Sequence, residues 1–164
     1  MPANTTFVSG AILTAAQMNN LPWGIVDATA GGTSGRGYVT RTSGDFSMTT
    51  TLADVTGQTV TFTPVTGRLY KVSFSAYISN VGTTQTAQIQ IADGSNVWKQ
   101  TALVYLPAST QQTVHTSVIL TGLSGSTTLK MRAKVSAANG ALIVGTTGNE
   151  AASVFCIEDI GPSA

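Results

Sequence analysis

Apolar and polar residues alternate one by one along four stretches of this chain, and the alternation limits the fold more than any other feature of the sequence. The four stretches are residues 69–79, 86–92, 113–120 and 127–135. Successive side chains of a β-strand point to opposite faces, so each stretch predicts a strand with one apolar and one polar face. The remaining stretches that fit as strands are residues 38–42, 60–63, 97–106, 141–145 and 152–160.

Turn signals that contain glycine separate the predicted strands at short intervals. Asn139-Gly140 is the best of them, because asparagine and glycine both accept the positive φ angles of a tight hairpin turn. Strands that each carry one apolar face bury it by packing two sheets face to face. The sequence therefore predicts an all-β fold, an antiparallel β-sandwich of the jelly-roll type, with the strand order left open.

Charged residues are scarce. They make up 9% of the chain and leave a net charge of +1, whereas an average domain contains about 25%. So weak a field does not attract nucleic acid or an anionic membrane surface. No apolar run approaches the ~20 residues that span a bilayer, and the first residues lack the basic start of a secretory signal peptide. We therefore expect a protein made in the cytoplasm, with no nucleic-acid partner and no membrane insertion.

Residues 1–30 are interpreted as an N-terminal segment distinct from the β domain. An apolar run over residues 7–13 is followed by Thr14, a suitable N-cap for a short helical turn that Pro22 would end. So short a helix is marginal alone and has to dock, either on the chain's own β domain or on another protein. The side chains expected to dock are Phe7, Ile12, Leu13, Met18, Leu21 and Trp23.

The rest of the chain is interpreted as a linker followed by one domain. Residues 31–37 are rich in glycine and predict a flexible linker. Residues 38–164 then form the β-sandwich domain, and their length is typical of a single domain.

The last predicted strand is apolar on both faces over residues 151–157. A strand of a two-layer sandwich has only one inner face, so its other face needs a second cover. That cover is either the N-terminal segment of the same chain or another subunit, and exposed apolar patches favour the subunit. The expected subunit interface comprises Tyr77, Ile119, Ser153, Phe155 and Ile157.

A search of the sequence for an active site gives a negative result. His115 is the single histidine, and Cys156, the single cysteine, lies in an apolar stretch where burial keeps a thiol unreactive. Glu158 and Asp159 are adjacent in a predicted strand and point to opposite faces, so they do not form a hydrolytic pair. The sequence predicts no catalytic residue, no metal site and no cofactor, and we expect a protein that is not an enzyme.

Two sets of residues remain as candidates for ligand contact. Trp98 and Tyr105 are aromatic residues of the type that forms sugar-binding platforms, and the strand register could turn Trp98 inward or outward. Lys130, Arg132 and Lys134 share one face of a predicted strand. That face is either simply solvated or contacts an acidic protein or an anionic glycan.

Three short segments carry a resemblance to known families. Near the start the chain reads Leu13-Thr14-Ala15-Ala16-Gln17-Met18-Asn19, then Pro22-Trp23-Gly24, and near the end Glu158-Asp159-Ile160-Gly161-Pro162. Both segments resemble those of minor tail and other minor structural proteins of tailed phages, especially phages of actinobacteria. Between them, Pro64-Val65-Thr66-Gly67 before Tyr70 is similar to the strand entry of C1q- and TNF-like jelly rolls, although Thr66 adds spacing.

The resemblance implies a structural protein on the surface of a virion, a minor tail, fibre-like or head-decoration component. It implies a homotrimer whose N-terminal segment attaches to another virion protein, of the capsid or the tail, while the β domain projects. It leaves open whether the site is on the head or the tail. The alternative function is a module that binds a carbohydrate or receptor on the host surface.

Overall fold

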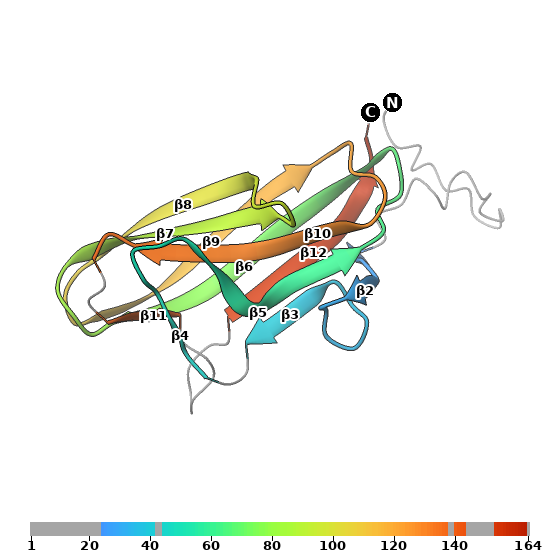
Figure 1. The fold of residues 1–164 in the computed structure, drawn as a ribbon. Coiled ribbons are helices and arrows are strands. Elements are labelled where there is room, and N and C mark those ends of the chain that lie inside the picture. The colour runs from blue at the N-terminus through green and yellow to red at the C-terminus, as the bar shows by residue number, and fades with distance from the viewer. Residues whose placement is uncertain (1–23, 42–43, 138–139, 144–152, 164) are drawn as a thin grey trace, which may run out of the picture.

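A computed structural model describes residues 24–41, 44–137, 140–143 and 153–163 of the chain. Within these residues every regular element is a β-strand (Figure 1). The expected helical turn lies outside the described residues, as does Asn139 of the predicted hairpin. The same holds for the side chains expected to dock, Phe7, Ile12, Leu13, Met18, Leu21 and Trp23.

The strands form two sheets. The seven-stranded sheet contains β1 (Gly24–Ile25), β3 (Tyr38–Arg41), β4 (Phe46–Ser47), β6 (Arg68–Asn80), β9 (Thr110–Leu120), β11 (Ala141–Ile143) and β12 (Ser153–Pro162). The five-stranded sheet contains β2 (Ala28–Ala30), β5 (Ala53–Phe62), β7 (Gln85–Asp93), β8 (Trp98–Leu106) and β10 (Thr127–Val135).

The longer strands give the fold its topology. They lie in the order β3-β12-β6-β9 in one sheet and β5-β10-β7-β8 in the other, and these neighbours are all antiparallel. Except for the hairpin β7–β8, each connection along these strands crosses from one sheet to the other, which is the pattern of a jelly roll. The predicted antiparallel β-sandwich is confirmed.

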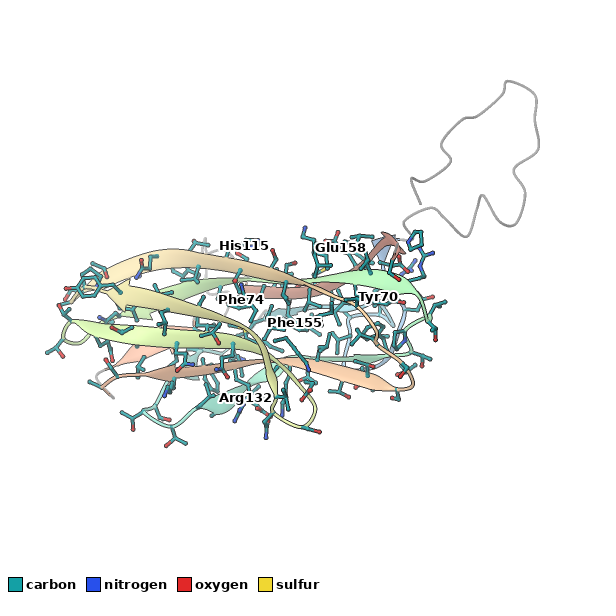
Figure 2. The ribbon with its side chains drawn as sticks, turned by 90° about the horizontal axis from the view of Figure 1, so that it is seen from above. Tyr70, Phe74, His115, Arg132, Phe155 and Glu158 are labelled. Carbon is teal, nitrogen blue, oxygen red and sulfur yellow. The ribbon has the colours of Figure 1, made fainter. Side chains whose placement is uncertain are left out.

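The core lies between the sheets and consists of the apolar faces that the alternation indicated. Tyr70, Val72, Phe74, Ala76 and Ile78 of β6 are all buried. They pack with the buried face of the other sheet, Ala87, Ile89 and Ile91 of β7 and Leu129, Met131, Ala133 and Val135 of β10. Figure 2 shows Phe74 between the two sheets, with His115 on one outer face and Arg132 on the other.

The last strand differs from the expectation. Ser153, Phe155 and Ile157 point into the core and are fully buried by their own chain, so placing them in a subunit interface was wrong. Burial of a side chain such as that of Phe155 stabilises the fold by about 1.5–3 kcal/mol. The outward residues of β12 include Val154 and Cys156, which are half-buried.

A buried ion pair fixes β12 beside the start of β6. The Arg68 guanidinium donates from Nε to Asp159 Oδ2 (2.5 Å) and from a terminal nitrogen to Oδ1 (2.7 Å), and the two side chains are 5% and 2% exposed. The backbone amide of Gly161 also donates to Oδ1, at 3.0 Å. Removing one member of a buried pair leaves the other charge unpaired, so this contact holds the strand register tightly.

The glycine-rich residues 31–37 are not a linker, which corrects the predicted domain boundaries. Strands β1 and β2 precede them and already pair with β12 and β5. A Cβ atom at Gly31 would lie 2.1 Å from the Thr59 carbonyl oxygen, and one at Gly37 would lie 2.3 Å from a methyl group of Val26. Glycine is present because the backbone here is packed against the sandwich, and the described domain therefore includes residues 24–37.

Both ends of the described chain lie at one end of the sandwich, which we call the base. Gly24 pairs with Asp159 close to the end of β12, and the amide of Ser163 donates to the Gly67 carbonyl at 2.8 Å. The turn between β7 and β8 and the loop between β9 and β10 lie at the same end. The connections β6–β7 and β8–β9 lie at the opposite end, farthest from the base (Figure 1).

Replacing Gly31 tests whether the glycine-rich segment is packed. Gly35 has a similar positive φ (72° against 81°), but a Cβ there meets nothing within 4 Å, so Gly35→Ala is the matched control. We expect Gly35→Ala to lower the free energy of unfolding by about 1–2 kcal/mol and Gly31→Ala by a further ~1–3 kcal/mol for the steric clash. Urea denaturation measures both losses, and equal losses would restore the linker interpretation.

Candidate ligand-binding face

The outer face of the five-stranded sheet gathers most of the residues that the sequence offered for ligand contact. We call it the ligand face. Strand register places Tyr105 beside Thr86, and Lys134 beside Gln88, which in turn lies beside Leu103. Lys130 and Arg132 lie on the same face of β10, because alternate residues of a strand share a face. Of the predicted ligand contacts, Trp98 alone has a side chain outside what the structure describes.

A hollow of about 320 Å³ lies on the ligand face. It is lined mainly by Thr50, Thr86, Gln88, Leu103, Lys134 and Ser136. Leu103 and Tyr105 lie on β8, at the edge of the sheet, and are 72% and 66% exposed. Apolar side chains so exposed, next to hydroxyl and amide groups, make a surface that suits a ligand with both apolar and polar faces.

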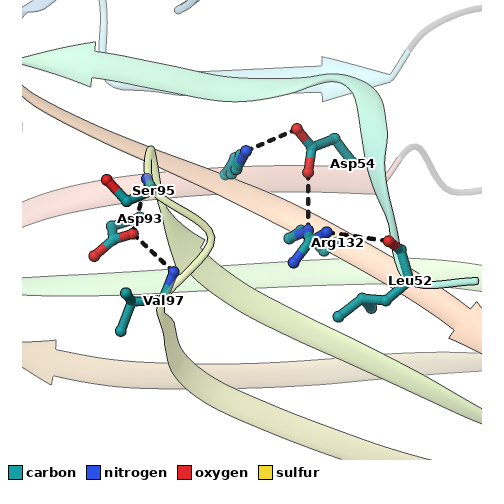
Figure 3. Close-up of polar contacts among 7 residues, drawn as sticks. Leu52, Asp54, Asp93, Ser95, Val97 and Arg132 are labelled. Atoms are coloured by element: carbon teal, nitrogen blue, oxygen red, sulfur yellow. Dashed lines mark hydrogen bonds and ion pairs between the residues drawn. The ribbon is translucent and has the colours of Figure 1, made fainter.

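Lys130 and Arg132 do not offer free charge to a ligand. Asp54 of β5 accepts from Lys130 Nζ at 2.8 Å and from Arg132 Nε at 2.9 Å, and Arg132 also donates to the Leu52 carbonyl at 3.0 Å (Figure 3). Lys130 is only 9% exposed. The charges of both cations are therefore compensated by Asp54. Of the three residues in the predicted basic stripe, Lys134 alone lines the hollow.

An irregularity in β5 brings Asp54 to this position. The pairing of β5 with β10 shifts between Lys130, which lies opposite Thr59, and Arg132, which lies opposite Asp54. Gly57 lies in the shifted stretch with φ of 77°. Such bulges bend a strand and redirect its side chains, and here the result is one carboxylate shared by two cations.

The turn before β8 is fixed by Asp93. Its carboxylate accepts from the amides of Ser95 (3.0 Å) and Val97 (2.9 Å) (Figure 3), and from Lys99 Nζ at 2.9 Å. The hydrogen bond from Lys99, together with those two amides, holds the pKa of Asp93 below its ordinary value. The strand that carries Leu103 and Tyr105 therefore begins from a rigid turn.

Two side-chain amides link the edge strand β8 to β9 of the other sheet. Gln112 of β9 donates to the Tyr105 carbonyl at 2.7 Å, and Gln100 of β8 donates to the Ser117 carbonyl at 3.5 Å. The first hydrogen bond occupies one backbone acceptor of β8 and the second occupies one of β9, so neither carbonyl is available for pairing with another strand. We therefore expect β8 to contact a ligand through the side chains on its outer face and not through strand pairing at its edge.

The outer face of the seven-stranded sheet has a different character. We call it the serine face, because Ser73 and Ser75 of β6 lie beside Ser117 and His115 of β9. Its charged residues Lys71 and Glu158 pair with each other at 3.3 Å, and Ile119, beside Lys71, is 58% exposed.

The remaining predicted residues of this face are also placed. The half-buried Tyr77 donates its hydroxyl to Gln111. Cys156 is half-buried on the same face, where burial raises the pKa of its thiol. Of the five predicted interface residues, only Tyr77 and Ile119 lie on an outer face.

Within the described residues no group of three or more histidine, cysteine, aspartate or glutamate side chains could hold a metal ion. In the same part of the chain no helix is long and apolar enough to cross a membrane.

Sequence reasoning missed several residues of the ligand face. Thr86 and Gln88 alternate with apolar residues, so they could have been found by assigning the outward side of β7. Leu103 carries no such signal, because an exposed leucine within an apolar strand looks like a core residue. Thr50, Ser136 and Asp54 reach the face through turns and the irregularity in β5, which local patterns do not reveal.

Comparison with known proteins gives remote similarities only. No protein-family model matches the sequence, and no curated protein matches it. Among solved structures, dimeric latent PorU from Porphyromonas gingivalis is 14% identical with a TM-score of 0.41, over 73% of this chain and 11% of that one. The enzymatically active domain of tailspike protein 4 of bacteriophage CBA120 is 12% identical with a TM-score of 0.31, over 82% and 22%.

A CBM4 structure is 12% identical with a TM-score of 0.25, over 76% of this chain and 92% of that one. This chain thus spans about a tenth of the length of PorU and less than a quarter of that of the tailspike domain. Similarities this weak identify neither a family nor a function.

Proposed function

We propose that this chain is a non-enzymatic structural protein of a bacteriophage particle. It is made in the host cytoplasm and assembles on the virion surface, where it acts by binding alone. Residues before Gly24 attach it to a capsid or tail protein, and the jelly roll projects from that attachment.

The meeting at the base of described residues from the three resembling segments supports this proposal. Gly24, the last residue of the first segment, pairs with Asp159 of the segment near the C-terminus. Asp159 in turn holds Arg68, which lies between Gly67 and Tyr70 of the jelly-roll entry. Segments far apart in the sequence thus build one base, at the point where the attachment segment joins the domain. The opposite end of the sandwich is then free to project.

Deleting residues 1–23 tests the attachment. The described domain begins with β1 at Gly24, so we expect the shortened protein to keep its fold and to be lost from assembled particles. Circular dichroism and thermal melting report the fold, and mass spectrometry of purified particles reports incorporation. A full-length Leu13→Asp, Leu21→Asp variant should show the same loss. Incorporation at the wild-type level would reject the attachment role.

We further propose that the protein associates as a homotrimer through the serine face. The cores of protein interfaces are depleted of charged residues, and on this face Lys71 and Glu158 neutralise each other. Small serine side chains allow close approach, and Ile119 offers an exposed apolar contact. The ligand face has more charge and a hollow, which suits it less to close packing against a second copy.

Light scattering tests this association. We expect the wild-type mass to correspond to three chains, and Ile119→Lys to lower it to that of one chain, because a lysine would bury an unpaired charge. Leu103→Lys, at a still more exposed residue on the opposite sheet, is the control and should remain trimeric. A wild-type mass of one chain at high concentration would remove the trimer proposal.

A second function is favoured by the ligand face, namely binding of a host-surface carbohydrate. Tyr105 and Leu103 form an exposed apolar platform beside the hydroxyl of Thr86 and the amide of Gln88. Sugars present an apolar ring face and a polar rim, and such a platform contacts both. This function is compatible with a virion structural role.

Truncating Tyr105 tests carbohydrate binding. We expect Tyr105→Ala to weaken binding of a glycan found on an array by about tenfold or more, because loss of the ring contact removes ~1.5 kcal/mol or more. Tyr105→Phe keeps the ring and should bind within a few-fold of wild type. Isothermal titration measures both affinities. Equal binding by Tyr105→Ala and wild type would place the sugar site elsewhere.

A further inference from the structure

One cation of the ligand face has no ion-pair or hydrogen-bond partner among the residues that the structure describes. All eight lysine and arginine residues lie within the described part of the chain. Seven of them have an ion pair or hydrogen bond, namely Arg36, Arg41, Arg68, Lys71, Lys99, Lys130 and Arg132. Lys134 makes neither with any described residue. Because the other seven lysine and arginine residues are all paired, this exception indicates a charge kept for a ligand.

The position of Lys134 supports that interpretation. Its side chain is half-buried and lines the hollow together with Thr86, Gln88 and Leu103. Asp54, the carboxylate on this face, already binds Lys130 and Arg132. A cation that is partly removed from water without a counter-charge is costly, and an incoming anion would relieve that cost.

The charge of the whole face is also suited to an anion. Three cations and one carboxylate, those of Lys130, Arg132, Lys134 and Asp54, leave the face with two net positive charges. The chain as a whole carries +1, so all other residues together carry −1. The attraction is therefore local to this face.

The groups around Lys134 identify the rest of the ligand. Across the sheet, Lys134, Gln88 and Leu103 form one row, and Ser136, Thr86 and Tyr105 form the next. Amide and hydroxyl groups lie in the middle of this array, a cation at one side and an apolar platform at the other. Such an array matches a polyhydroxylated chain that carries an anionic group.

The size of the array excludes a single small sugar as the best ligand. Tyr105 lies two strands across the sheet from Lys134 and two residues along it, which places their backbone positions on the order of 12 Å apart. An oligosaccharide can place its anionic group at Lys134 while another unit contacts Tyr105 and Leu103.

We propose that the ligand face binds an acidic glycan, with the anionic group seated on Lys134. This rests on the carbohydrate-binding function proposed above and names the class of sugar. The anion is either the carboxylate of a uronic acid or the phosphate of a sugar- or polyol-phosphate polymer, since both present oxygens to an ammonium group.

Titration of the full-length protein with three probes tests the proposal. The probes are neutral dextran oligomers, oligogalacturonate and poly(glycerol phosphate), each at low and high salt. We expect at least one acidic probe to bind about tenfold or more tightly than dextran, with the preference reduced by salt. The better acidic probe decides between carboxylate and phosphate.

Variants then assign the preference to Lys134. Lys134→Gln should abolish the preference for the acidic probe, and Lys134→Arg should keep most of it. Arg36→Gln, at an exposed cation outside both the ligand face and the serine face, is the control and should bind as wild type does. Thermal melting checks that each variant is folded.

The negative outcomes distinguish failure of the acidic-glycan proposal from failure of carbohydrate binding as such. Dextran binding equal to that of the acidic probes, and unchanged in Lys134→Gln, overturns the inference and leaves carbohydrate binding intact. No binding of any glycan overturns both. Binding of poly-glutamate as tightly as the acidic glycans, and independent of Tyr105, also overturns it and indicates an acidic protein as the partner.

Discussion

Burial of one face of every long strand is the constraint on which the rest of this structure depends. The inner faces of β6, β7, β10 and β12 supply the core, so they are not available for any other contact. Function is left to the two outer faces, the loops and the segment before β1. In a chain with so few charged residues, the way in which charges are paired on the outer faces then becomes informative.

The two outer faces are suited to different partners. On the serine face one ion pair cancels its own charge, and small side chains leave the surface open to close packing with a second copy. On the ligand face one carboxylate is shared between Lys130 and Arg132, and Lys134, beside an apolar platform, pairs with none of the described residues. Under the function proposed above, one face would serve assembly and the other recognition, and the sandwich presents them on opposite sides.

The strands and their inward faces follow from local alternation, which is why segments such as residues 127–135 could be placed from sequence alone. The predictions that were wrong concerned positions that depend on contacts between residues far apart in the sequence. Gly31 looks like linker glycine, because its neighbour Thr59 is unknown until β2 pairs with β5. Phe155 was assigned to the wrong surface because residues 151–157 are apolar on both faces, so their pattern does not indicate which face points into the core. The partner of Arg132 depends on the register shift near Gly57, which no local pattern reports.

The position of β12 has a consequence for how the chain folds during its synthesis. This strand lies between β3 and β6 in the middle of its sheet and supplies Asp159 to the buried pair with Arg68, yet it comes last along the chain among the described strands. Until it leaves the ribosome, β3 and β6 lack the strand that lies between them, and Arg68 lacks the carboxylate of Asp159. The pairing of β3 and β6 with β12 therefore has to wait until this strand has been synthesised, and it joins residues that are far apart in the sequence.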